Sequence, residues 1–141
     1  LPSLSTWFQH ENNIRVGVIG SFSYLQYPFY GKTLSNYVQY LGVRGPHGTY
    51  STFASCKAWR QAIGSGRYSY VLFTTGVVSK KSELSSAEVP EMGWTASDTN
   101  AKVVLGGQLR TAPPYPGYLG YTLYRVGSQF STDGCQGFTQ N

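Results

Sequence analysis

The side chains that could carry out acid–base or nucleophilic chemistry are few and scattered in this sequence of 141 residues. Its two histidines are His10, in an expected helix, and His47, in the loop-like stretch RGPHG. His47 could serve as a general base, but the nearby Arg44 would oppose its protonation. The carboxylates and histidines lack the spacing of a glycosidase pair or of a metal site. We therefore expect no catalytic residue and no metal.

The sequence also lacks the glycine-rich loops that hold phosphates. GVIGSFSY has glycines at positions 17 and 20 but not the G-x-G-x-x-G pattern of dinucleotide-binding loops. YGKT ends like a Walker sequence, but Gln26 stands where the first glycine belongs. The 11 basic and 6 acidic residues give a net charge of +5, yet the cations are scattered and no nucleic-acid-binding motif is visible. We expect no cofactor and no specific nucleic-acid partner.

Aromatic side chains are the more prominent candidates for ligand binding. They make up 16% of the chain, whereas charged residues make up only 12%. A tyrosine ring stacks on the apolar face of a sugar, while hydroxyl groups and cations bind the polar groups of the sugar. The alternative is that these rings are core and pack under a long loop. The residues that we expect to form a glycan-binding rim are Tyr24, Tyr27, Tyr30, Arg44, His47, Thr74, Thr75 and Trp94.

The rim residues need a sheet whose strand ends bring them together. From apolar periodicity, capping residues and turn signals, the expected elements are strands at 14–21, 36–42, 68–76, 107–112 and 120–127 and helices at 55–66 and 97–106. This alternation predicts an α/β fold, namely a small three-layer Rossmann-like or flavodoxin-like parallel sheet with a C-terminal antiparallel edge hairpin. Such sheets bind ligands at the carboxyl ends of their strands, which is where we expect the rim.

The length of the chain and its two cysteines bear on its organisation. We expect a single α/β domain over residues 1–141, with an N-terminal helix or linker at 1–13 and a polar tail at 127–141. Cys56 and Cys135 are either two separate buried thiols or one disulfide. A cysteine in a polar, glycine-rich tail favours the disulfide, which would tether the tail to the start of a helix and indicate an oxidising compartment. The chain opens without an initiator Met, so we expect a mature product or an excised domain.

Four short motifs, in a fixed order, resemble those of a known family. They are a Tyr-Gly, Leu-Ser-Asn and Val-Gln-Tyr segment at 30–40, a Cys-x-x-Trp-Arg helix, a Gly-x-Tyr-x-Tyr-Val strand entry and a late cysteine. The series, from about Ile14 to Cys135, resembles the soluble C-terminal extracytoplasmic domain of actinobacterial-type, multi-spanning membrane proteins of the glycosyltransferase kind. Catalytic acids of that family belong to the membrane portion, so the resemblance implies a non-catalytic accessory domain.

The resemblance also implies the partners of such a domain. They would be its own transmembrane region or another protein of the cell envelope, together with a glycan or a lipid-phosphate sugar. The alternative is a free-standing secreted protein that binds a partner or a carbohydrate without enzymatic activity.

Overall fold

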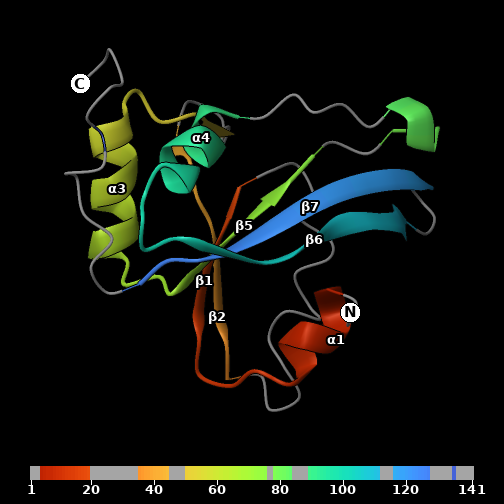
Figure 1. The fold of residues 1–141 in the computed structure, drawn as a ribbon, viewed down its shortest axis with the longest axis horizontal. Helices are drawn as coiled ribbons and strands as arrows, with labels where there is room; N and C mark the ends of the chain where they lie inside the picture. The colour runs from red at the N-terminus through yellow and green to blue at the C-terminus, as the bar shows by residue number, and fades with distance from the viewer. Residues whose placement is uncertain are drawn as a thin grey trace.

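The computed structural model describes residues 4–19, 35–44, 50–75, 78–83, 89–111, 116–127 and 135. No helix in these ranges is long and apolar enough to cross a membrane. The elements follow one another in the order α1 (Leu4–Gln9), β1 (Arg15–Ile19), β2 (Tyr37–Tyr40), β3 (Val43–Arg44), β4 (Tyr50–Ser51), α3 (Cys56–Ser65), β5 (Tyr70–Thr74), η3 (Lys81–Glu83), α4 (Pro90–Ala96), β6 (Lys102–Thr111) and β7 (Gly117–Arg125) (Figure 1).

The main sheet is mixed rather than parallel. Its strand order is β2-β1-β5-β7-β6, and β1 pairs in parallel with both β2 and β5. Strand β7 pairs antiparallel with β5, and β6 pairs antiparallel with β7. The Rossmann-like or flavodoxin-like parallel sheet expected from the sequence is therefore wrong. Only β2, β1 and β5 run parallel, and the long β6–β7 hairpin forms the rest of the sheet.

The region expected to be the second helix explains much of this difference. Helix α4 ends at Ala96 and strand β6 begins at Lys102, so residues 97–106 do not form the expected helix. The β-branched Val103 and Val104 favour an extended backbone. Strand β6 also pairs with β7 along its whole length, with one irregularity after Val103. Pairing with a strand further along the chain thus overrides a local pattern of capping residues.

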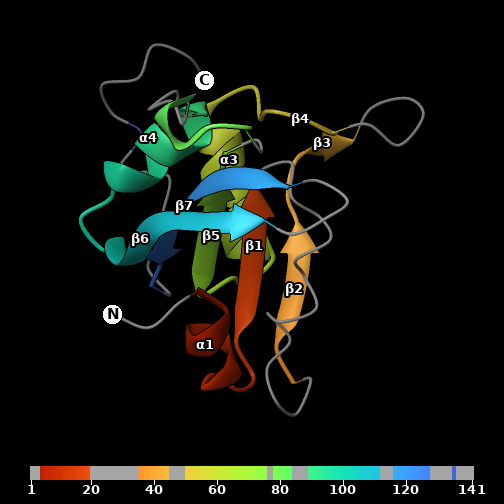
Figure 2. The ribbon, with the colours of Figure 1, turned by 90° about the vertical axis from the view of Figure 1, so that its right-hand side faces the viewer.

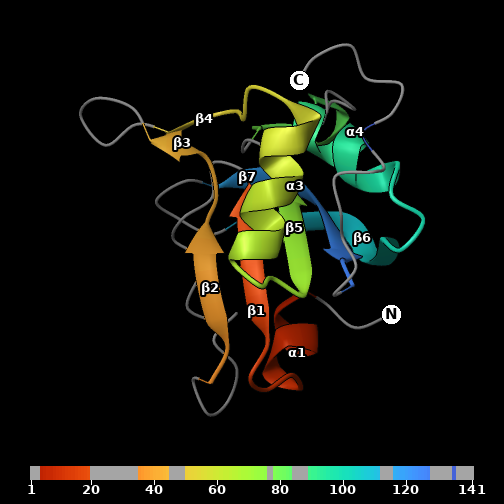
Figure 3. The same cartoon turned by 90° about the vertical axis from the view of Figure 1, so that its left-hand side faces the viewer.

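Helices lie on both faces of the sheet, but the two faces are covered unequally. Helices α3 and α4 lie on one face (Figure 3), whereas the short α1 lies on the other face, near the amino ends of the parallel strands (Figure 2). The core beneath α3 and α4 contains Ile19, Cys56, Trp59, Ile63, Val71, Phe73, Trp94, Tyr124 and Val126. The core beneath α1 contains Leu4, Phe8, Val16, Val18, Val38, Leu72, Leu105 and Leu123.

Helix α3 forms where the sequence predicts a helix. Ser55 is its N-cap, and the Ser55 hydroxyl oxygen accepts a hydrogen bond from the backbone nitrogen of Ala58 at 3.0 Å. Trp59 on its inner face is buried against the sheet. Gly66 closes the C-terminal end of the helix, and Arg67 follows with a φ of 54°. This left-handed residue turns the chain toward β5, so the end of α3 lies beside the amino edge of the sheet.

Candidate binding site

The residues expected to form a glycan-binding rim lie only partly within the described structure. The Thr74 hydroxyl, at the end of β5, donates a hydrogen bond to the carbonyl oxygen of Ile19 at 3.4 Å. The next residue, Thr75, accepts one through Oγ1 from the backbone nitrogen of Gly120 at 2.9 Å. Both threonines therefore link β5 to neighbouring strands. Arg44 lies in β3, while Tyr24, Tyr27, Tyr30 and His47 lie outside the described residues.

Trp94 lies in the core rather than on the surface. Its side chain is only 7% exposed and belongs to the core cluster beneath α3 and α4. The backbone carbonyl oxygen of Trp94 accepts a hydrogen bond from Nη2 of Arg60 at 2.6 Å. In this structure the residue holds α4 against α3, and its ring is not open to a ligand.

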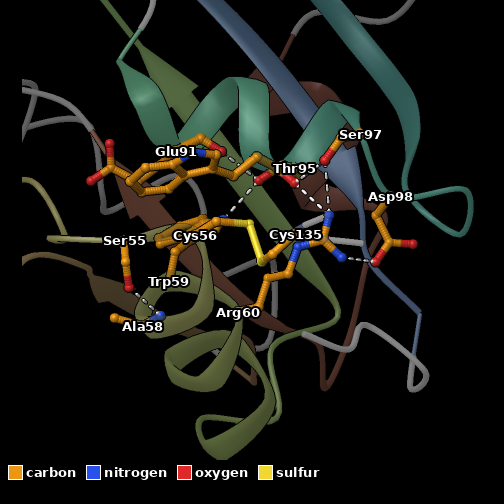
Figure 4. Close-up of a disulfide and its surroundings, with 11 residues drawn as sticks. Ser55, Cys56, Ala58, Trp59, Arg60, Glu91, Thr95, Ser97, Asp98 and Cys135 are labelled. Carbon is orange, nitrogen blue, oxygen red and sulfur yellow. Dashed lines mark hydrogen bonds and ion pairs between the residues drawn. A yellow bond between two sulfur atoms is a disulfide. The ribbon is translucent and has the colours of Figure 1, made fainter. Parts of the chain in front are cut away.

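A buried polar network joins α3 to α4 and to the residues that follow α4 (Figure 4). Arg60 forms an ion pair with Asp98, and 2.5 Å separates Nη1 from Oδ2 although both side chains are buried. Nη2 of Arg60 also donates to the hydroxyl of Ser97 at 3.0 Å. On the same helix pair, the indole nitrogen of Trp59 donates to Oγ1 of Thr95 at 2.9 Å. These bonds fix the position of α4 on α3.

Glu91 of α4 is the second buried carboxylate, and it too has an internal partner. Its side chain is fully buried, and Oε2 accepts a hydrogen bond from the backbone nitrogen of Phe53 at 2.9 Å. The backbone carbonyl of Glu91 accepts a hydrogen bond from the Thr95 hydroxyl at 2.8 Å. The carboxylates of Glu91 and Asp98 thus bind other parts of the fold, and we assign both to structural roles.

A disulfide joins Cys56, the first residue of α3, to Cys135 (Figure 4). The two Cα atoms lie 5.6 Å apart, across a sequence separation of 79 residues. The sequence-based preference for a disulfide over two separate thiols is confirmed. The disulfide ties the C-terminal part of the chain to the same end of α3 that Ser55 caps.

A different group of side chains meets at the amino edge of the sheet, where β1, β2 and the end of α3 come together. Arg15 and Tyr37 begin their strands, and the parallel register places them directly beside each other. The guanidinium carbon of Arg15 lies 4.0 Å from the centre of the Tyr37 ring and 5.6 Å from that of Tyr68. The two rings are stacked, with centroids 6.5 Å apart. We call Arg15, Tyr37 and Tyr68 the tyrosine–arginine cluster.

The fold holds this cluster in place through the end of α3. Nε of Arg15 donates a hydrogen bond to the carbonyl oxygen of Gly66 at 2.8 Å. The C-terminal end of a helix carries partial negative charge, which favours a cation at this position. The Tyr37 hydroxyl donates to Oε1 of Gln39 at 3.0 Å, while 43% of the Tyr37 residue remains exposed. The ring is therefore oriented by the protein and still open to solvent.

The hydroxyl of Tyr68 stays protonated at neutral pH. Partial burial raises the pKa of Tyr68 above the ordinary value of 10.0, the nearby Tyr37 raises this pKa as well, and Arg15 lowers it. A neutral phenol is a poor base near pH 7 but can both donate and accept a hydrogen bond. Together with the ring faces and the guanidinium group, it is suited to binding a polar ligand.

The tyrosine–arginine cluster lies outside the rim expected from the sequence. Arg15 and Tyr37 fall in or next to the expected strands, but only the parallel register between these strands shows that they are neighbours. Tyr68 belongs to the Gly-x-Tyr-x-Tyr-Val motif, two residues after the glycine that closes α3. The sequence signal for this cluster is a cation and an aromatic residue at matching positions of two adjacent parallel strands. The sequence-based prediction instead places the rim at the carboxyl ends of the strands.

The described residues also contain no group of three or more His, Cys, Asp or Glu side chains that could hold a metal ion. No protein-family model, curated protein or solved structure matches this chain. The resemblance to extracytoplasmic domains of membrane glycosyltransferases therefore stays a prediction, and function is best argued from the tyrosine–arginine cluster itself.

Proposed function

We propose that this chain is a non-catalytic, extracytoplasmic domain that binds a glycan at the tyrosine–arginine cluster. The observation that carries this proposal is the Tyr37 ring, which is 43% exposed and lies against Arg15. A ring that is already fixed loses little conformational freedom when a ligand stacks on it. The hydroxyl of Tyr68 and the guanidinium group lie next to the ring and can bind the hydroxyl groups of a sugar.

The disulfide between Cys56 and Cys135 supports the extracytoplasmic location. Disulfides form and persist in oxidising environments such as the cell envelope and the extracellular space. The low content of charged residues, 12%, is also common among proteins of this location. On this basis the domain is secreted or belongs to the cell envelope.

The resemblance noted in the sequence supports a more specific role. In that role the chain is an accessory domain of a membrane glycosyltransferase-like protein, and it holds an acceptor glycan or a lipid-phosphate sugar near the membrane portion. The chemistry would then be carried out by the membrane portion, and the domain would contribute affinity and orientation.

Docking on a protein is a second candidate function, and one observation favours it. Val103 is 59% exposed on β6, which is the last strand of the sheet on that side. An edge strand presents unpaired backbone N–H and C=O groups to another chain, and the exposed Val103 side chain would add an apolar contact there. The partner would be the domain's own transmembrane region or another envelope protein.

A Tyr37→Ala substitution tests the first function, with Tyr118→Ala as the matched control. Tyr118 is a partly buried tyrosine on β7, at the opposite end of the sheet from the cluster. On a panel of immobilised oligosaccharides, we expect Tyr37→Ala to weaken binding about fivefold to tenfold, because loss of a stacking ring costs roughly 1–1.4 kcal/mol. The control should bind like the unmodified chain. If Tyr37→Ala binds as tightly as Tyr118→Ala and the unmodified chain, the tyrosine–arginine cluster is not the glycan-binding site.

A further inference from the structure

We propose that the glycan bound by the tyrosine–arginine cluster is anionic, and that a carboxylate or phosphate group on it binds the terminal nitrogens of Arg15. This inference rests on the proposed function and specifies its ligand class. It follows from the way Arg15 is held, from the lack of a carboxylate partner for Arg15 among the described residues and from the neighbouring Tyr37 ring.

The orientation of Arg15 is fixed by three contacts. Its Nε donates to the carbonyl oxygen of Gly66 at 2.8 Å, and its guanidinium group lies over Tyr37 and near Tyr68. A guanidinium group has five N–H donors in one plane, of which Nε supplies one. In the described part of the chain, nothing accepts a hydrogen bond from the other four, which belong to Nη1 and Nη2. These two nitrogens form the fork that binds two oxygens of a carboxylate or phosphate.

Among the described residues, the charge of Arg15 has no carboxylate partner. The single ion pair found there joins Arg60 to Asp98, in the buried network between α3 and α4. Glu91 is buried in the same region and bound to Phe53. What lies next to the Arg15 cation is the helix end and two aromatic rings, which carry only partial negative charge. An anion from outside would therefore meet a fixed, incompletely neutralised cation.

The surrounding charge also favours an anion. Arg67 is exposed and stands between Gly66 and Tyr68, both of which contact Arg15. The whole chain has a net charge of +5, so the mean field attracts negative ligands.

The Tyr37 ring and the two terminal nitrogens of Arg15 together narrow the class of ligand further. An isolated anion would use the Arg15 fork but not the exposed Tyr37 ring, while a neutral sugar would use the ring and offer the fork only hydroxyl groups, which are weaker acceptors than an oxyanion. A saccharide that bears a uronate carboxylate or a phosphate uses both. The shared chemistry is thus an oxyanion attached to a sugar ring.

The test is binding of the chain to immobilised oligosaccharides of three kinds: neutral only, uronate-containing and phosphate-substituted. We expect the unmodified chain to prefer one or both acidic kinds by about tenfold or more. Arg15→Lys keeps the charge but removes the fork, and it should reduce this preference to about twofold. Arg125→Lys is the matched control. Arg125 is an exposed arginine that follows Tyr124, a core residue on the face of the sheet covered by α3, so the Arg125 side chain points to the other face, which α1 covers. The control should keep the preference.

Each outcome separates this inference from the function on which it rests. A preference for uronate or for phosphate identifies the source of the oxyanion. Binding to neutral and acidic oligosaccharides alike would overturn the inference and leave glycan binding in place, as would an acidic preference that Arg15→Lys leaves unchanged. Binding to none of the three kinds would overturn both. If Arg15→Lys fails to fold, the guanidinium NMR signals of Arg15 in the unmodified chain must shift when the preferred acidic glycan is added, and unchanged signals would contradict the proposal.

Discussion

Two arginines of this molecule, Arg60 within helix α3 and Arg15 beside its C-terminal end, differ in how their charge is neutralised. Arg60 is 1% exposed and is paired with Asp98 inside the protein. Arg15 is only partly buried and lies against the rings of Tyr37 and Tyr68 and the carbonyl of Gly66. The first has its counter-ion within the fold, because a buried charge without one is strongly destabilising. The second can lack one because water reaches it, and it is therefore available to a ligand.

The comparison predicts that loss of the Arg60 partner has the largest effect on stability. Asp98→Asn would leave the Arg60 cation buried without its counter-charge. Breaking a buried pair in this way costs about 3–5 kcal/mol. Urea unfolding at neutral pH should show this loss, while the exposed Lys102→Gln serves as a control with little effect. A loss below about 1 kcal/mol would mean that water reaches Arg60 and that the contrast with Arg15 is wrong.

Removing the disulfide should have the next largest effect. The double substitution Cys56→Ser and Cys135→Ser opens a loop that closes over 79 residues. We expect a loss of about 2–5 kcal/mol in the free energy of unfolding, measured by thermal and urea denaturation. Glycan binding by the folded fraction should persist, since the disulfide lies at the other end of α3 from the tyrosine–arginine cluster. A loss of binding in a folded double variant would contradict the separation of these two regions.

Arg15→Gln should affect stability much less. It removes a cation from the C-terminal end of α3 and from the face of Tyr37, and each of these interactions is worth about 0.5–1 kcal/mol at exposed sites. The same unfolding experiment should therefore give a loss of roughly 1–2 kcal/mol, well below that of Asp98→Asn. If the two losses were equal, Arg15 would be a structural residue like Arg60.

The smallest expected effect on stability comes from ionisation of Tyr68 in alkaline solution. Because the pKa of Tyr68 is higher in the folded protein than its ordinary value of 10.0, the folded state retains this proton after the unfolded chain has begun to lose it. The contribution of Tyr68 to stability is thus complete below pH 10 and is lost as the pH rises through the folded-state pKa. Difference absorbance of tyrosinate, compared between the unmodified chain and Tyr68→Phe, should place this titration above pH 10. A titration of Tyr68 below pH 10 would indicate that Arg15, rather than burial, dominates its environment.

The sequence predicts local features of this fold better than strand pairing. Helix α3, with Ser55 as its cap, follows from local patterns because its hydrogen bonds are local. The expected C-terminal antiparallel hairpin forms, but β6 extends back to Lys102 and replaces part of the expected helix at 97–106, and β7 pairs with β5. Neither the extension of β6 nor the pairing of β7 with β5 follows from a local pattern. The tyrosine–arginine cluster was missed for the same reason. It depends on the register between β1 and β2 and on where α3 ends.

The most direct measurement of the central claim is a map of amide and side-chain NMR shifts on the unmodified chain, titrated with an oligosaccharide that it binds. We predict that the largest shifts cluster on Arg15, Tyr37, Tyr68 and Gly66, at the amino edge of the sheet. Shifts that cluster instead at the end of β5, on Thr74 and Thr75, would contradict this and return the site to the carboxyl ends of the strands.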